Sequence, residues 1–169
     1  PESYGRLLMS PGPIFEPEAR RQDYWRTARA FFAAGFRSGD VVHNSFAYHL
    51  SPGAFIMEAG ARALGCAVVP AGVGNTGAQV EAMARLAPAG FTGTPDYLKA
   101  LLDAAAEAGR EVTSVKRALV SGGALFPALR ADYESRGITC RQCYAIAELG
   151  LVAYESEAME GMIVDEGVM

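Results

Sequence analysis

The sequence predicts an α/β fold in which a mainly parallel sheet is covered by helices and followed by a short β-hairpin segment. Short apolar runs alternate with longer segments of helical periodicity along most of the chain. Such alternation is typical of parallel strands that are joined by right-handed helical crossovers. The 169 residues are 50% hydrophobic, which is enough for one packed domain.

The first regular element that the sequence predicts is a helix over residues 17–36, after an irregular segment over residues 1–16. Pro11 and Pro13 cannot continue a helix or a central strand because proline lacks the backbone donor, whereas Pro17 suits a first helical turn. After this helix we expect a strand over residues 41–44, a helix over 51–64, a strand over 66–70, a helix over 77–86, a strand over 90–94 and a helix over 95–108.

The last third of the chain predicts two more strands of the parallel sheet, over residues 116–121 and 138–144, with a helix over residues 127–136 between them. Beyond them, weak alternation and a second apolar stretch predict a hairpin around Asp165–Gly167. The chain ends at Met169 without a helix cap or a polar tail. We therefore expect that the last element is cut off there.

Small, aromatic and acidic residues follow these last two strands, where a parallel sheet presents its carboxyl edge to a ligand. Gly122 and Gly123 let the backbone approach a flat ring, while Tyr144 offers a stacking face. Glu148 offers an oxygen ligand for a hard cation such as Mg²⁺. This set suits a nucleotide with its metal. The alternative is that the glycines form an ordinary turn, Tyr144 belongs to the core and Glu148 is solvated.

Composition and charge favour small molecules as partners. The net charge is −4, with both signs interspersed, so no basic stripe supports binding to nucleic acid or to an anionic membrane. No apolar run reaches the length of a membrane span, and the N-terminal residues do not resemble an export signal, so we expect a cytoplasmic location. Walker, dinucleotide and nucleophile-elbow fingerprints are absent, and Gly72-x-Gly74 lacks a third glycine.

The cysteines and histidines do not form a metal site in this interpretation. Cys140 and Cys143 fall in one predicted strand, where residues three apart point to opposite faces, so we expect buried free thiols. His43 and His49 are not at metal-ligand spacing, and a histidine at a strand end is typical of hydrogen-bonded structure.

The order of several motifs resembles the phenylacetate–CoA ligase branch of the adenylate-forming enzymes, and nearly the whole chain takes part. His43–Tyr48 resembles the aromatic stretch beside the acyl pocket of that family, and residues 63–70 resemble the helix end and strand that follow it. Gly72–Thr76 resembles the glycine turn of the family, and Thr94–Tyr97 resembles its Thr-Pro-Ser-Tyr helix start. Ser121–Ala124 falls where the family has its adenine-side turn, and Tyr144–Glu148 falls where it has Tyr-Gly-Leu/Met-Ser/Thr-Glu.

The resemblance implies a two-step reaction. A carboxylate attacks the α-phosphate of ATP to give an acyl-adenylate and pyrophosphate, and the CoA thiol then displaces AMP. ATP or AMP and Mg²⁺ are the implied cofactors, CoA is the co-substrate, and a small aryl or other apolar carboxylic acid such as phenylacetate is the substrate. The implied nucleotide-binding residues are Ser121, Gly122, Gly123, Ala124, Tyr144, Ala145 and Ala147; the implied acyl pocket is Phe46, Tyr48, Gly72, Gly74 and Thr94; Glu148 is implied as catalytic residue and Mg²⁺ ligand.

The resemblance also divides the chain into an irregular segment (1–16), a nucleotide- and acyl-binding subdomain (17–149) and a truncated β-rich subdomain (150–169). Residues 10–18 stand where the family has a lysine-containing phosphate loop, but prolines remove backbone donors there and two glutamates oppose the phosphate charge. Ala145 and Ala147 replace a glycine and a hydroxyl residue of the family pattern. We therefore expect that this loop does not grip a triphosphate in the family manner.

Two further alternatives stay open. The family's ribose-binding aspartate region and its mobile C-terminal domain with the catalytic lysine have no counterpart before Met169, so the chain alone is expected to be inactive as a ligase. A non-catalytic descendant that binds a nucleotide or an acyl group is one alternative, and an unrelated Rossmann-like domain such as a methyltransferase is another. Apolar edges of a truncated sheet would favour a homo-oligomer.

Overall fold

The computed structural model describes residues 4–168, and it confirms the predicted α/β fold. The first three residues and Met169, which belong to the predicted terminal segments, lie outside the described residues. In chain order the elements are β1 (Tyr4–Ser10), β2 (Ile14–Ala19), α1 (Ala28–Ala33), β3 (Val41–Asn44), α2 (Gly53–Ala63), β4 (Ala67–Pro70), α3 (Thr76–Leu86), β5 (Gly90–Gly93), α4 (Pro95–Glu107), β6 (Arg117–Val120), α5 (Pro127–Ser135), β7 (Thr139–Ile146), β8 (Gly150–Glu155), β9 (Met162–Val164) and the 3₁₀ turn η1 (Glu166–Val168).

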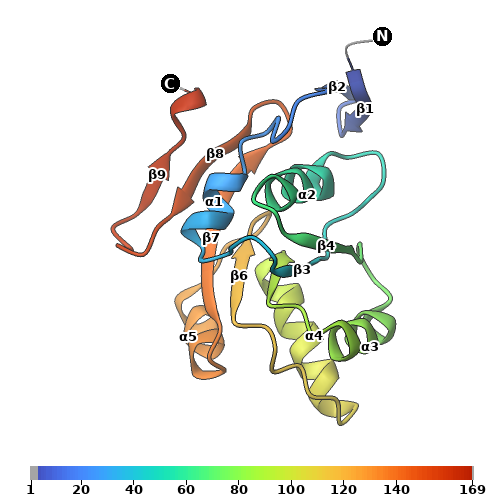
Figure 1. The fold of residues 1–169 in the computed structure, drawn as a ribbon, viewed down its shortest axis with the longest axis vertical. Coiled ribbons are helices and arrows are strands. Elements are labelled where there is room, and N and C mark those ends of the chain that lie inside the picture. The colour runs from blue at the N-terminus through green and yellow to red at the C-terminus, as the bar shows by residue number, and fades with distance from the viewer. Residues whose placement is uncertain (1–3, 169) are drawn as a thin grey trace.

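The main sheet has seven strands in the order β4-β3-β5-β6-β7-β8-β9 (Figure 1). Every pair from β4 to β7 is parallel, whereas β8 and β9 are added in antiparallel fashion. The carboxyl ends of β3, β5, β6 and β7 therefore meet at one edge of the sheet. The polar and small residues that follow these strands gather there.

Helices cover both faces of this sheet (Figure 1). On one face, α3, α4 and α5 enclose a core cluster that includes Phe91 and Val120. On the other face, α1 and α2 enclose a cluster that includes Phe31 and Leu119. Leu119 and Val120 are consecutive residues of β6, so the strand is buried on both sides, as is typical of a parallel sheet.

The predicted cysteine arrangement is confirmed. Cys140 and Cys143 are free and buried, and they belong to the clusters on opposite faces of the sheet. Burial raises the pKa of both thiols to about 12, because a thiolate would lose its hydration there.

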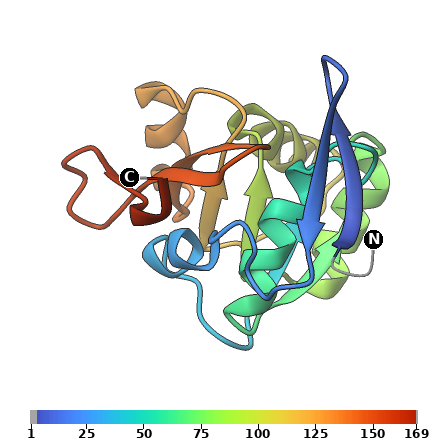
Figure 2. The same cartoon turned by 90° about the horizontal axis from the view of Figure 1, so that it is seen from above.

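The N-terminal prediction is wrong in two respects. Strands β1 and β2 form an antiparallel hairpin in place of an irregular segment, and Figures 1 and 2 show it beside α2, apart from the main sheet. The helix expected over residues 17–36 is reduced to α1, which has six residues. Asp23 and Arg26 have positive φ angles, which break a helix before Ala28. The carboxylate of Asp23 then accepts from the backbone N–H of Ala28 at 3.1 Å.

The C-terminal hairpin forms, but its turn is not where the sequence predicts it. Strand β8 pairs with β9 from Ala153–Val164 to Glu155–Met162, so the turn spans residues 156–161. Asp165–Gly167 follows the second strand, and Glu166–Val168 is a 3₁₀ turn. Asp165 has a buried structural role that the turn signal Asp-Glu-Gly does not reveal.

None of the helices within residues 4–168 combines the length and hydropathy that a membrane-spanning helix requires.

Candidate functional site

A cavity of about 510 Å³ lies at the carboxyl edge of the main sheet. Five residues predicted for the nucleotide or acyl site line it: Phe46, Ser121, Gly122, Ala145 and Ala147. Phe46 follows β3, Ser121 and Gly122 follow β6, and the two alanines lie at the end of β7 and just beyond it. The strand order thus brings together residues that are about a hundred positions apart in the sequence.

Gly122 lies next to Phe46 in the lining of this cavity. Its φ of +72° is in the left-handed region, which glycine adopts without strain. A Cβ atom at this position would lie 3.5 Å from the Phe46 ring and 3.7 Å from the Thr94 methyl group. A flat ligand group can therefore approach the backbone of Gly122 closely, with Phe46 and Thr94 beside it.

Ser121 connects the ends of β6 and β7. Its hydroxyl donates to the carbonyl oxygen of Cys143 at 2.8 Å, and its N–H donates to Gly93 O at 3.1 Å. The neighbouring Tyr144 has an exposed fraction of 55%, so its ring is not buried beneath the sheet. An exposed aromatic ring is therefore present at the end of β7, and the adenine prediction stays open.

The other predicted site residues lie outside the cavity lining. Tyr48 accepts a hydrogen bond from Asn44 Nδ2 at 2.8 Å and packs edge-on against Phe55, with ring centroids 5.4 Å apart. Burial raises its pKa, and nearby Glu58 adds to this shift. The carbonyl oxygens of Gly72 and Gly74 accept from Gln79 Nε2 at 2.9 and 2.7 Å.

Gln79 also joins the glycine turn to His43. Because its amide nitrogen donates to the two glycine carbonyls, its Oε1 accepts from His43 Nε2, at 2.8 Å. Burial lowers the pKa of His43, which favours the neutral ring. His43 is therefore part of the scaffold that shapes the turn, in agreement with its interpretation as hydrogen-bonded structure.

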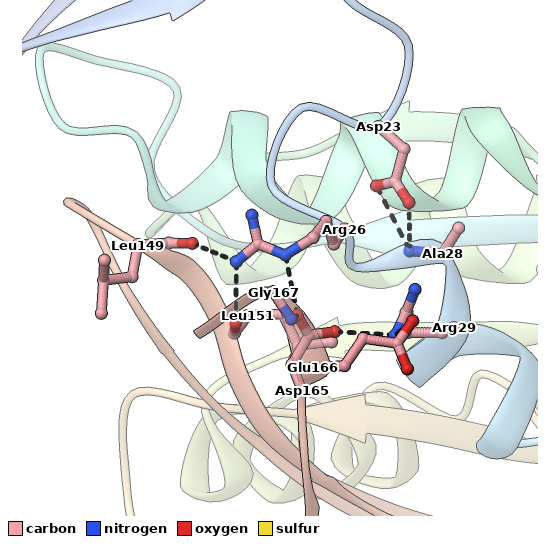
Figure 3. Close-up of polar contacts among 9 residues, drawn as sticks. All are labelled: Asp23, Arg26, Ala28, Arg29, Leu149, Leu151, Asp165, Glu166 and Gly167. Carbon is pink, nitrogen blue, oxygen red and sulfur yellow. Dashed lines mark hydrogen bonds and ion pairs between the residues drawn. The ribbon is translucent and has the colours of Figure 1, made fainter. Parts of the chain in front are cut away.

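Glu148 is exposed in the short connection between β7 and β8. Arg26, which is distant in sequence, binds the backbone of this connection (Figure 3). Its Nη2 donates to Leu149 O at 2.6 Å and to Leu151 O at 3.2 Å. Its Nε donates to Oδ1 of Asp165, whose carboxylate is fully buried, at 2.8 Å. We call Arg26 and Asp165 the Arg26 clamp.

Two close backbone contacts reinforce the Arg26 clamp. Leu151 N donates to Trp25 O at 3.0 Å. Gly150 has a φ of +74°, and a Cβ atom there would lie 2.7–2.8 Å from Trp25, which excludes any side chain. Trp25 is 4% exposed and shares a cluster with Leu8 and Ile56, against which Ala145 packs. The segment that carries Glu148 is thus fixed to the N-terminal part of the chain.

The tip of the N-terminal hairpin forms another wall of the cavity through Ser10 and Pro11. The amide of Met9 donates to Leu50 O at 2.9 Å, which ties the hairpin to the loop before α2. Ser10 donates its hydroxyl proton to Glu16 Oε1 at 2.5 Å. The predicted loop thus reaches the site, but as a strand end and a tight turn.

Sequence reasoning missed three apolar lining residues: Ile56, Met57 and Ile146. Ile56 and Met57 belong to the first half of α2, the helix that follows β3. Since the amino end of such a helix lies at the carboxyl edge of the sheet, the strand–helix order could have identified both. Ile146 stands between two alanines of the Tyr144–Glu148 motif, and the extension of β7 to this residue was not predicted.

Comparison with known proteins agrees with this geometry. No family model matches the chain. A curated phenylacetate–coenzyme A ligase from Aromatoleum evansii is 33% identical over 152 residues, which cover 85% of this chain and 34% of that protein. One from Pseudomonas putida is 35% identical over 125 residues, which cover 72% of this chain and 28% of the relative. The resemblance to the phenylacetate–CoA ligase-like branch of the adenylate-forming enzymes is confirmed. The chain spans about a third of the length of these relatives.

Solved structures of adenylate-forming CoA ligases have the same fold. A 2-hydroxyisobutyryl-CoA ligase, crystallised in complex with 2-HIB-AMP in the postadenylation state, superposes with a TM-score of 0.86 at 25% identity, over 96% of this chain and 38% of that one. The anthranilate CoA ligase AuaEII, in complex with anthranoyl-AMP, gives a TM-score of 0.68 at 19% identity, over 90% of this chain and 31% of that one. The second likeness bears on the fold alone.

Proposed function

We propose that this chain is the nucleotide- and acyl-binding part of an ATP-dependent acid–CoA ligase, which adenylates an aryl or other apolar carboxylic acid such as phenylacetate and transfers the acyl group to CoA. The observation that carries the proposal is the cavity of about 510 Å³ at the carboxyl edge of the sheet. It gathers five predicted site residues on a fold shared with CoA ligases.

The apolar part of the cavity suits the acid. Phe46, Ile56, Met57 and Ile146 supply aromatic and aliphatic surface, and small residues leave room between them. Ligand pockets are mostly apolar with a few polar groups that orient the ligand. An apolar acid with a ring or a branched chain would contact the apolar surface, and its carboxylate would meet the polar groups.

Adenine is proposed to lie between the Gly122–Ala124 turn and Tyr144. The turn offers bare backbone, since Gly122 has no side chain and Ala124 is exposed, and Tyr144 offers a ring that is 55% exposed. Aromatic rings stack on flat ligands in this way with a gain beyond the buried area. Ala145 and Ala147 would flank the nucleotide without a hydroxyl group of their own.

Glu148 is proposed as the Mg²⁺ ligand. Mg²⁺ keeps several waters and is commonly bound by one or two carboxylates together with substrate phosphates, so one exposed carboxylate at the site fits it. The Arg26 clamp would hold the backbone that follows Glu148 without forming an ion pair with its carboxylate. Bound Mg²⁺ would neutralise phosphate charge.

The hairpin does not fit a triphosphate. Pro11 and Pro13 lack the backbone donor, and Glu16 and Glu18 are both buried in the second strand of the hairpin. A phosphate cradle needs several N–H groups that converge on one anion. We therefore assign the β- and γ-phosphates no residue of this hairpin.

The test is acid-dependent release of pyrophosphate from ATP by a protein that carries this chain within the full length of its relatives. Release that depends on an apolar acid and is followed by thioester formation with CoA supports the proposal. No release with any member of a panel of aryl and aliphatic acids would reject it.

Within that protein, Glu148→Gln should lower the rate of adenylation by a factor of about a hundred, because the amide is a much weaker Mg²⁺ ligand than a carboxylate. Excess Mg²⁺ should restore part of the rate. Glu157→Gln, an exposed glutamate in the β8–β9 turn, is the control and should leave the rate unchanged. An unchanged rate in Glu148→Gln would return Glu148 to a solvated residue without a role.

A second function, binding of a nucleotide or acyl group without adenylation, is favoured by the hairpin. Its prolines and buried glutamates are the features that oppose ATP use. Calorimetric titration separates the two cases: binding of AMP or of an acid without pyrophosphate release would support the second function.

A further inference from the structure

Ser10 and Ser121 line the cavity, and the hydroxyl proton of each is already donated within the protein. Ser10 donates to Glu16 Oε1 at 2.5 Å, and Ser121 donates to Cys143 O at 2.8 Å. A hydroxyl group has one proton and two lone pairs. Both serines can therefore offer a ligand in the cavity only lone pairs, which accept hydrogen bonds.

Glu16 adds a negative charge to the acceptor character of the cavity lining at Ser10. It is 8% exposed, and within the described residues its second oxygen, Oε2, is buried and has no hydrogen-bond partner. A buried carboxylate with a free acceptor is costly unless a donor reaches it or its neighbourhood. The negative charge behind Ser10 also opposes any anion that approaches from the cavity.

Glu18 stands two residues further along the same strand and differs in this respect. Both of its oxygens accept from Arg6 Nη1, at 2.8 and 2.6 Å, so its charge is paired. It borders a different cavity, of about 270 Å³, which Arg6 and Arg62 also line. Of these two glutamates, only Glu16 is hydrogen-bonded to Ser10 of the nucleotide- and acyl-binding cavity, and only Glu16 keeps an unpaired oxygen.

We propose that Ser10 Oγ, with Glu16 behind it, forms a hydrogen-bond acceptor subsite that binds an O–H or N–H group of the ligand and repels a phosphate. The inference rests on the proposed function, because it concerns the same cavity. It names the substrate class more narrowly: an apolar carboxylic acid that carries a hydroxyl or amino substituent. It also explains why the hairpin stands at a nucleotide site without gripping the β- and γ-phosphates.

The first experiment compares AMP with ATP, both with Mg²⁺, as ligands of this chain. Trp25 is the only tryptophan and packs with Ile56 of the cavity wall, so its fluorescence reports binding, and calorimetry gives an independent value. In the unmodified chain ATP should bind no more tightly than AMP. Glu16→Gln removes the negative charge that opposes the phosphates, so the affinity for ATP relative to AMP should rise about tenfold.

Glu18→Gln is the matched control, since it removes one negative charge from the same strand without touching Ser10. It should leave the ratio of ATP to AMP affinity within about twofold of the unmodified chain. An equal gain in both variants would overturn the subsite, because it would show only a loss of net charge. ATP that binds much more tightly than AMP to the unmodified chain would overturn it as well.

The second experiment tests the donor preference with phenylacetate and its hydroxy- and amino-substituted forms. At least one substituted acid should bind several-fold more tightly than phenylacetate, and Ser10→Ala should abolish that advantage while phenylacetate itself still binds. Ser10→Ala removes a single hydroxyl group from a partly exposed residue. A cooperative thermal unfolding transition of this variant would confirm that it folds. An advantage that survives in Ser10→Ala would overturn the proposal.

Different outcomes would reject the acceptor subsite and the proposed function. Binding of AMP and of acids that is insensitive to Ser10→Ala and Glu16→Gln would reject the subsite and leave the proposed function in place. A chain that binds none of these ligands by fluorescence or calorimetry would reject both.

Discussion

Two walls of the cavity are built in different ways, and the start of α2 forms a third. The sheet wall, which comprises Ser121, Gly122 and Ala145–Ala147, lies at the ends of β6 and β7, two strands in the interior of the seven-stranded sheet. The hairpin wall, which comprises Ser10 and Pro11, belongs to a two-stranded sheet. A two-stranded sheet is marginally stable by itself and depends on what its inner face contacts.

The inner face of the hairpin is partly charged. Leu8 packs with Trp25 and Ile56, but Glu16 and Glu18 are also buried there. The outer face leaves Leu7 and Phe15 about three-quarters exposed, at 76% and 75%. One side of the cavity thus rests on the main core, whereas the other rests on a few apolar contacts and on two buried carboxylates, of which only Glu18 forms an ion pair. A rigid wall and a weakly held wall together suit a site that must admit a ligand.

The largest expected difference between the two walls appears when one leucine is removed from each. Leu119 of β6 is fully buried, and Leu8 of β1 is 5% exposed. Leu119→Ala should lower the free energy of unfolding by about 4 kcal/mol, and Leu8→Ala by about 2 kcal/mol, because the hairpin can move to fill the space. Urea denaturation measures both. Leu7→Ala, on the exposed face, should change it by less than about 0.5 kcal/mol. Equal losses at Leu119 and Leu8 would show that the walls are equally rigid.

Gly150 tests how tightly the sheet wall is joined to the N-terminal part of the chain. Gly150→Ala combines strain at a positive φ with overlap against the Trp25 backbone, and it should cost about 3 kcal/mol. Gly137→Ala is matched, because its φ is +73° and nothing lies within 4 Å of the added Cβ atom. It should cost about 1 kcal/mol, which isolates the backbone term. Similar losses in the two variants would contradict the close contact with Trp25.

The sequence predicted the sheet wall well and the hairpin wall poorly, for a physical reason. Strands such as Val41–Asn44 and Arg117–Val120 are fixed by apolar periodicity, which is visible in the residues themselves. The same holds for the helices that begin at Pro95 and Pro127. The residues that end in the cavity could be named because they follow these strands directly.

The hairpin depends on pairs that no periodicity encodes. Glu16 and Glu18 resemble the acidic start of a helix, yet they face inward, where Ser10 and Arg6 donate to them across the strand pair. Asp165 resembles a turn residue, yet it is buried because Arg26, 139 positions away, reaches it. Such long-range polar partners become visible only in the folded chain.

The Arg26 clamp should contribute a smaller amount of stability than Gly150. Asp165→Asn keeps the shape of the side chain but leaves Arg26 without its buried counter-charge, which should cost about 2 kcal/mol. The control is Glu166→Gln, since Glu166 pairs with Arg29 at the surface, and it should cost less than about 0.5 kcal/mol. Hydrogen exchange at the amide of Leu151, which donates to Trp25 O, should accelerate only in Asp165→Asn. Exchange that stays slow there would mean that the clamp does not hold the segment after Glu148.

The smallest expected effect on stability at neutral pH concerns Cys140 and Cys143, on opposite faces of β7, the strand that ends in the sheet wall. Burial raises the pKa of both thiols from 9.0 to about 12. Because the folded-state pKa exceeds the unfolded value, the stability that the neutral thiols contribute is fully present below pH 9 and is lost as the pH rises from 9 toward 12.

At pH 8.5 the native chain should therefore react with iodoacetamide at least about a hundredfold more slowly than the chain in denaturant, since the thiolate is the nucleophile. Peptide mass mapping assigns the modified cysteine. Rapid native alkylation of either thiol would mean that β7 opens as readily as the hairpin, and the contrast between the two walls would then be wrong.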